Sequence, residues 1–233
     1  RISNFTDFNI FESIPGVSVR YVKRAAQLGN PDLILLPGTK NTMGDLKWMR
    51  MNGLEAAVLK QASDGTLVMG ICGGYQMLGQ RIADPEGIEN VIKADGSEGL
   101  RGLELLPMET VLKPEKVRTQ TSGSMEITEG ALAGFSSHRI HGYEIHMGET
   151  FPAEAGSGLN GSQQAGAGQQ PGNASRADHS VAPAICLADG RMDGFVRADG
   201  LVFGSYLHGL FDNLEFTGAI LTRLAEKKGI SLT

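Results

Sequence analysis

The chain has 233 residues, of which 41% are hydrophobic and 20% charged, and its formal net charge is −5. This length suits one well-buried α/β domain, and the composition excludes collagen, coiled coils and wholesale disorder. The basic residues are scattered, which gives no support to a nucleic-acid partner, and no apolar run approaches the ~18 residues of a membrane span. The two cysteines, Cys72 and Cys186, lie far apart, which excludes a disulfide scaffold and a zinc site built on cysteine pairs.

Apolar residues follow strand and helix patterns in alternation along the chain. Two short apolar runs, residues 32–36 and 66–71, predict buried strands, and residues 102–111, 140–147 and 201–206 predict further strands. Helical spacing predicts helices over residues 46–63, 74–82 and 215–228. This alternation favours an α/β fold in which a mostly parallel sheet is covered by helices on both faces. In such sheets the functional sites lie at the carboxyl ends of the strands.

The segment 154–178 is rich in Gly, Ser and Gln and has almost no large apolar residue. It cannot offset the entropy of ordering, so we expect a flexible low-complexity loop at the surface. Its Gly156-x-Gly158-x-x-Gly161 pattern has no strand before it and no helix after it, and therefore does not predict a dinucleotide site.

Residues 1–233 are expected to form one domain that contains this loop. The first residue is Arg1 rather than Met, and no signal peptide precedes it. We therefore expect a fragment of a longer, cytoplasmic protein.

A candidate nucleophile lies where the strand at 66–71 runs directly into a helix. The spacing Gly70-x-Cys72-x-Gly74 is that of a nucleophile elbow with Cys in place of Ser. Small neighbours permit a sharp turn that raises the side chain above the sheet. The positive end of the helix dipole would then face the sulfur and stabilise a negative charge there. The backbone N–H of Gly73 could face the oxygen of a tetrahedral intermediate.

A thiolate nucleophile needs a base, and His208 is the best placed of the five histidines. It follows the strand expected at 201–206, and its alternative interpretation is an exposed loop histidine. His138, His141 and His146 crowd one segment, but they lack the i, i+4 helical spacing of a metal site, and no metal is expected. Glu144 and His146 would share one face of a strand, where they could orient a catalytic group, bind substrate or form a surface ion pair.

Cys72 in Gly-Ile-Cys-Gly-Gly-Tyr-Gln-Met-Leu-Gly and His208 in Tyr-Leu-His-Gly-Leu-Phe resemble the class I glutamine amidotransferases. The resemblance implies a flavodoxin-like, three-layer α/β fold. Three further segments, residues 1–8, 36–42 and 142–148, resemble more narrowly the C-terminal amidotransferase domain of the cobyric acid synthase family. The similarity extends from Arg1 to about Gly229, apart from the glycine-rich loop.

The resemblance implies a glutamine-hydrolysing domain that supplies ammonia to a ligase of cobalamin biosynthesis. The whole enzyme would amidate the b, d, e and g carboxylates of adenosylcobyrinic acid a,c-diamide. Glutamine and an N-terminal ATP- and corrinoid-binding domain would be the partners, with ATP and Mg²⁺ bound in that other domain and no cofactor in this one. The chain contains no Gly-x-x-x-x-Gly-Lys-Ser/Thr motif, which agrees with this division.

The resemblance also implies roles for single residues. Cys72 would be the nucleophile and His208 the general base and acid. The backbone N–H groups of Gly38 and Gly73 would form the oxyanion hole, and the side chains of Thr39 and Gln76 would line the glutamine pocket.

One position departs from the usual His-x-Glu pattern, because Leu210 stands where the glutamate is expected. The orienting partner of His208 is then another acid, a backbone carbonyl or water, and we expect Glu144. Glu144 and His146 are alternatively residues of a domain contact.

Other functions remain open at this point. The same chemistry could serve a cobyrinic a,c-diamide synthase or a cell-wall amidating enzyme. A non-catalytic domain of the same fold usually loses the nucleophile, whereas Cys72 and His208 are both present. A cysteine protease would need a peptide-binding groove.

Overall fold

The computed structural model describes residues 5–89, 99–153 and 180–230. The segment 154–178, expected to be a flexible loop, lies outside the described residues. No helix in the described ranges is long and apolar enough to cross a membrane.

The strands of the described chain form one curled sheet of ten members. Along the sheet the order is β1 (Leu33–Leu36), β2 (Leu67–Ile71), β9 (Val202–Ser205), β8 (Met192–Arg197), β7 (Val181–Leu187), β5 (Met108–Met125), β3 (Arg81–Ala83) and β4 (Gly99–Arg101). Two further strands, β6 (Arg139–Pro152) and β10 (Leu207–His208), pair with each other, and β6 also pairs with β5. The sheet is parallel across β1, β2 and β9 and between β3 and β5, and its other pairings are antiparallel.

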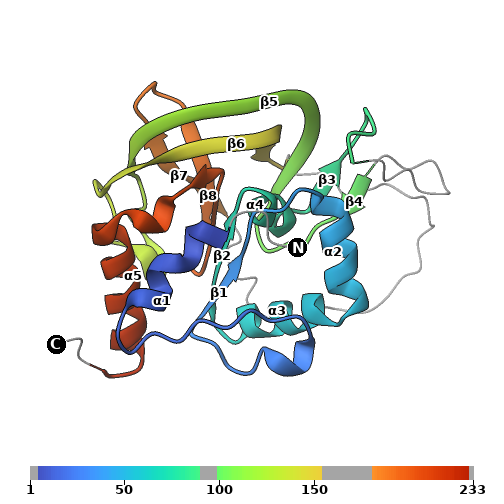
Figure 1. Ribbon diagram of the computed structural model, residues 1–233. Helices are drawn as coiled ribbons and strands as arrows, with labels where there is room; N and C mark the ends of the chain where they lie inside the picture. The colour runs from blue at the N-terminus through green and yellow to red at the C-terminus, as the bar shows by residue number, and fades with distance from the viewer. Residues whose placement is uncertain (1–4, 90–98, 154–179, 231–233) are drawn as a thin grey trace, which may run out of the picture.

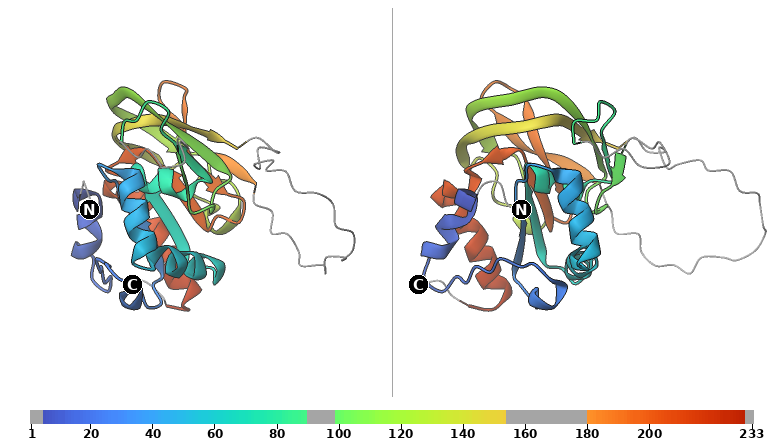
Figure 2. Two further views of the ribbon diagram at one scale, coloured as in Figure 1. Left: turned by 90° about the vertical axis from the view of Figure 1, so that its right-hand side faces the viewer. Right: turned by 45° about the vertical axis from the view of Figure 1, so that its right-hand side comes forward.

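Helices cover the parallel part of the sheet on both sides (Figures 1 and 2). One side carries α2 (Thr42–Met51), α3 (Leu54–Ser63) and α4 (Gly73–Leu78), and the other carries α1 (Asn9–Ser13) and α5 (Leu214–Lys227). Short 3-10 helices complete the described elements: η1 (Phe5–Phe8), η2 (Ala25–Gln27), η3 (Gly130–Leu132) and η4 (Leu210–Asp212).

The two faces of the sheet bury separate hydrophobic cores. Every residue of β2 is buried. Val68 belongs to the core between the sheet and α2, and Met69 belongs to the core between the sheet and α5. This alternation follows from the period of two along a strand. The expected three layers are therefore present, with the parallel strands as the middle layer.

Some predicted boundaries are wrong, for local reasons. The helix expected over 46–63 is broken between α2 and α3, because Gly53 adopts a left-handed conformation with φ of 70°. The helix expected over 74–82 ends at Leu78, and Arg81–Ala83 form β3 instead. The strand expected over 102–111 starts only at Met108.

The long β5–β6 hairpin arches over the carboxyl ends of β1 and β2 (Figure 1). The register of this hairpin shifts between Val111 and Lys116, where it bends. Strand β10 then pairs with β6, with His208 opposite Tyr143 and Leu207 opposite Glu144. The hairpin thus brings its own side chains to the end of the sheet where Cys72 lies.

Candidate active site

The turn expected at Cys72 is present. Cys72 follows β2 directly, α4 begins at the next residue, and the Cys72 backbone has φ of 52° and ψ of −111°. A non-glycine residue in this region stores roughly 1–3 kcal/mol of strain and persists only when its surroundings hold it there. The surroundings do so by close contact: a Cβ at Gly70 would lie 2.6 Å from the Gly74 carbonyl oxygen, and a Cβ at Gly74 would collide with the Leu36 carbonyl oxygen.

The Cys72 side chain lies beneath strand β6. The residue is 8% exposed, and its thiol donates a hydrogen bond to the Ile145 carbonyl oxygen over 3.4 Å. The β5–β6 hairpin therefore covers the sulfur from above the sheet.

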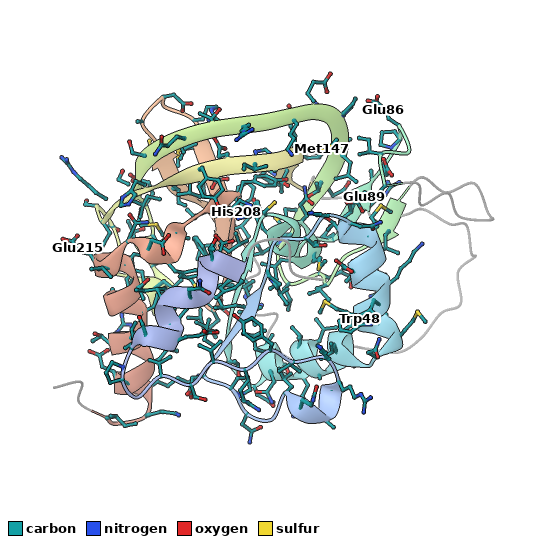
Figure 3. The ribbon with its side chains drawn as sticks, viewed as in Figure 1. Trp48, Glu86, Glu89, Met147, His208 and Glu215 are labelled. Carbon is teal, nitrogen blue, oxygen red and sulfur yellow. The ribbon has the colours of Figure 1, made fainter. Side chains whose placement is uncertain are left out.

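His208 lies under the same strand, as Figure 3 shows, and is 4% exposed. Its Nδ1 atom is 2.8 Å from a carboxylate oxygen of Asp7, whose other oxygen accepts the N–H of Gly209 over 3.0 Å. The Tyr143 ring stacks on the imidazole with centroids 5.3 Å apart. The imidazole is thus held on one edge by a buried carboxylate and on one face by an aromatic ring.

Burial alone would lower the pKa of His208. Hydrogen bonds to Asp7 and to the Cys72 side chain outweigh burial and raise the pKa of His208 to about 9. At neutral pH the ring is therefore an imidazolium beside the Cys72 sulfur. A cysteine–histidine pair acts as nucleophile and proton donor when the sulfur is a thiolate and the ring is an imidazolium.

The expectation that Glu144 orients His208 is wrong, because Asp7 occupies that place. The pairing of β6 with β10 puts Tyr143, not Glu144, opposite His208. The buried Glu144 carboxylate instead accepts hydrogen bonds from Arg191 over 2.8 and 3.4 Å. The neighbouring His146 imidazole and the Arg191 guanidinium lower the pKa of Glu144, although burial opposes them.

Asp7 is the residue that sequence reasoning missed. It lies in η1, more than 200 positions from the histidine that it holds. The available signal in the sequence was the opening segment of residues 1–8, which contains Asp7 and carries part of the family resemblance. In the structure, the buried side chains of Phe8 and Phe11 tie that segment to the core.

The loop after β1 lies beside the elbow, as expected for Gly38 and Thr39. A Cβ at Gly73 would lie 3.1 Å from the Thr39 backbone nitrogen. The Thr39 hydroxyl donates to the Asp45 carboxylate, which holds the loop against α2. Gly38 is buried near the start of the same loop.

Gln76 is buried, and protein groups occupy its amide. The Nε2 atom donates to the Met147 carbonyl oxygen over 3.0 Å and to the Tyr206 hydroxyl over 3.2 Å, and the Oε1 atom accepts from the Thr42 hydroxyl over 3.0 Å. Figure 3 shows Met147 on β6, further along the strand that covers His208. In this structure Gln76 therefore ties α4 to α2 and to the covering strand.

Within residues 5–89, 99–153 and 180–230, no three His, Cys, Asp or Glu side chains gather in a way that could hold a metal ion. A cysteine on a strained turn beside an oriented imidazolium has the arrangement that nucleophilic acyl transfer needs.

Comparison with known families matches residues 1–216 to the CobB/CobQ-like glutamine amidotransferase domain. The chain is 42% identical over 231 residues to the cobyric acid synthase of Lachnoclostridium phytofermentans and 44% identical over 231 residues to that of Ruminiclostridium cellulolyticum. The alignments cover 99% of this chain and 41% and 40% of those relatives. The chain thus spans about two fifths of the length of the curated relatives that it matches.

Two solved structures share the fold. A crystal structure of a glutamine amidotransferase has a TM-score of 0.58 at 14% identity, covering 97% of this chain and 95% of that one. The structure of PurLQS from Thermotoga maritima has a TM-score of 0.60 at 17% identity, covering 93% of this chain and 91% of that one. These similarities confirm the predicted three-layer α/β fold.

Proposed function

Because the chain belongs to the CobB/CobQ-like glutamine amidotransferase domain family, we propose that it hydrolyses glutamine and supplies ammonia within a cobyric acid synthase. The ammonia would serve the ATP-dependent amidation of the b, d, e and g carboxylates of adenosylcobyrinic acid a,c-diamide. The observation that carries this proposal is the Cys72 elbow beside a His208 imidazole held by the Asp7 carboxylate. The identity with cobyric acid synthases supports this acceptor over the others considered.

The first half of the reaction transfers the glutamyl group to sulfur. The Cys72 thiolate adds to the side-chain carbonyl carbon of glutamine, and the oxygen becomes negatively charged. The backbone N–H groups of Gly38 and Gly73 are the proposed donors to that oxygen, and removing one such donor typically costs about 3 kcal/mol in kcat. The carbon–nitrogen bond then breaks as the His208 imidazolium gives its proton to the nitrogen, which leaves as ammonia. Such proton transfer contributes roughly 10²–10⁴-fold to the rate.

The second half releases glutamate. Neutral His208 takes a proton from water as the oxygen attacks the thioester, and the thiolate leaves, which restores the starting ion pair. Asp7 keeps Nδ1 protonated throughout, so that Nε2 is the nitrogen that exchanges the proton.

Glutamine must reach a buried sulfur in this scheme. Since Cys72 and His208 are 8% and 4% exposed, strand β6 has to shift from the Ile145 contact to admit the substrate. ATP and Mg²⁺ would act on the acceptor in the remaining part of the longer enzyme, and no cofactor enters the steps above. We place the reaction in the cytoplasm, where the thiols of Cys72 and Cys186 stay reduced.

The test uses the full-length enzyme with the corrinoid acceptor and ATP. Cys72→Ala should abolish glutamate release and glutamine-driven amidation while leaving amidation from added ammonia intact. Cys186→Ala, a matched change in the half-buried thiol of β7, should leave both reactions unchanged. A folded Cys72→Ala variant that loses the ammonia-driven reaction as well, or one that still releases glutamate, would contradict the proposal.

A further inference from the structure

The first turn of helix α2 is capped by Glu89, which lies 47 positions beyond Thr42 in the chain. The backbone N–H groups of Thr42 and Met43 donate to the two carboxylate oxygens of Glu89 over 2.8 and 2.7 Å. Asn41 accepts the next N–H group, that of Gly44, over 2.6 Å. The first N–H groups of a helix have no partner within the helix, and the positive end of its dipole favours a negative charge there. Glu89 therefore meets both requirements at the start of α2.

A tight turn after β3 holds Glu89 in this place. The Asp84 carboxylate, which is 5% exposed, accepts the N–H groups of Ile88 and Glu89 over 2.7 and 2.9 Å. Gly87 has φ of 66°, a conformation that glycine adopts without strain. Figure 3 shows Glu89 beside the start of α2 and Glu86 on the outer part of the same turn. The carboxylate of Glu89 thus reaches α2 from a backbone that is itself held in place.

The first turn of α2 also touches the candidate active site. A Cβ at Gly73, the residue after the nucleophile, would lie 3.1 Å from the Thr42 hydroxyl oxygen. That hydroxyl donates to the side-chain oxygen of Gln76 over 3.0 Å. The Gln76 amide in turn donates to the carbonyl oxygen of Met147, on the strand that covers Cys72. The position of Thr42 therefore affects the elbow, the Gln76 amide and the covering strand together.

The loop of residues 37–41 depends on the same turn of α2. This loop connects β1 to α2 and contains Gly38 and Thr39, the two residues expected to face the substrate. The Thr39 hydroxyl donates to the Asp45 carboxylate of α2, so a shift of the start of α2 would carry the loop with it. A displacement of about 1 Å at a catalytic group can lower a rate by roughly 10²-fold.

We propose that Glu89 is a positioning residue for glutamine hydrolysis, which holds the start of α2 against the elbow. This inference rests on the proposed function, because the roles of Gly38 and Thr39 in the reaction belong to it. Glu89 binds the backbone of α2, so it acts through Thr42 and the loop 37–41 rather than on a reacting atom. Its carboxylate keeps the oxyanion donor and the glutamine pocket in place before the substrate arrives.

The test compares two reactions of the full-length enzyme, amidation driven by glutamine and amidation driven by added ammonia. Glu89→Ala removes both acceptors, and we expect kcat/KM for glutamate release to fall about tenfold, the equivalent of one charge-assisted hydrogen bond. The ammonia-driven rate should not change, because that reaction does not use the glutamine site. Glu89→Gln keeps one acceptor oxygen and should recover most of the loss. Glu86→Ala, the matched change at an exposed glutamate of the same turn, should leave both reactions unchanged.

A second variant provides the measurement in case Glu89→Ala does not fold. Asp84→Asn replaces one acceptor oxygen of the turn by an N–H donor, and it should lower glutamate release while sparing the ammonia-driven reaction. Unchanged glutamate release in Asp84→Asn or in a folded Glu89→Ala variant would overturn the inference. An equal loss of both reactions would also overturn it, because a purely structural role lowers both through the amount of folded enzyme. If the unmodified enzyme releases no glutamate, the proposed function itself fails.

Discussion

Replacing Asp7 by Asn tests the group that sets the charge of the catalytic imidazole. The asparagine keeps an oxygen for the Gly209 N–H but removes the negative charge beside His208 Nδ1. Burial, which lowers the pKa of His208, is then opposed only by the neighbouring Cys72. We therefore expect the pKa of His208 to fall from about 9 towards its ordinary value of 6.5.

The size of the effect follows from the two pKa values. At pH 8 an imidazole with a pKa of about 9 is ~90% protonated, and one with a pKa of 6.5 is ~3% protonated. Because the imidazolium donates the proton to the leaving ammonia, the variant should release glutamate up to ~30-fold more slowly at pH 8. The fall in kcat/KM at high pH should move from near 9 to a lower pH by about 1–2 units.

The assay is the pH dependence of kcat/KM for glutamate release by the full-length enzyme. Asp212→Asn is the matched control, since Asp212 lies next to Gly209 and is exposed. A high-pH limb that stays near 9 in Asp7→Asn, or one that shifts as far in Asp212→Asn, would refute the reasoning.

The same shift has a consequence for stability. A histidine whose pKa is raised on folding contributes stability that is fully present below pH 6.5 and is lost as the pH rises through about 9. The free energy of unfolding of the unmodified chain should therefore fall by up to ~3 kcal/mol over this window. Urea unfolding at pH 6 and pH 9.5 should show a much smaller difference for Asp7→Asn.

Two further substitutions test the site and its scaffold. His208→Ala should slow glutamate release by roughly 10²–10⁴-fold in the full-length enzyme, and an unchanged rate would remove His208 from the mechanism. Gly74→Ala should destabilise the chain by about 3 kcal/mol in urea unfolding, because the new Cβ would lie 2.0 Å from the Leu36 carbonyl oxygen. Its control is Gly218→Ala in the exposed middle of α5, where no atom lies within 4 Å of the new Cβ, and this change should stabilise the chain by up to about 1 kcal/mol.

The parts of the fold that the sequence predicts are those with a strong local pattern. Strands β1, β2 and β9 are buried apolar runs, and α5 carries a regular apolar face. The break at Gly53 was missed because apolar spacing continues across it, whereas the left-handed backbone that ends α2 leaves no trace in that spacing. The curl of β5 was missed because it depends on a register shift against β6 and on pairing with the distant strand β7, and neither leaves a pattern within the apolar spacing of β5.

The active site likewise has one part that the sequence predicts and one part that it does not. The elbow is formed by consecutive residues: the end of β2, the turn at Cys72 and the start of α4 all lie within residues 70–76. Its pattern is therefore visible in the sequence. Asp7 lies against His208 because η1 packs on η4, where the rings of Phe8 and Phe211 have centroids 6.1 Å apart. No pattern within either segment predicts the contact between Asp7 and His208.

The register of β10 against β6 decides which carboxylate serves which histidine. Residues opposite one another in an antiparallel pair share a face, and the observed register gives His208 the partner Tyr143. A slip by one residue would place Glu144 against His208, which is the arrangement expected from sequence. Gly142 holds the observed register, since its missing side chain lets the strand lie directly on the His208 carbonyl oxygen. Glu144 is thereby turned away from the proton-transfer histidine and towards His146 and Arg191, which leaves Asp7 as the acid that keeps His208 charged.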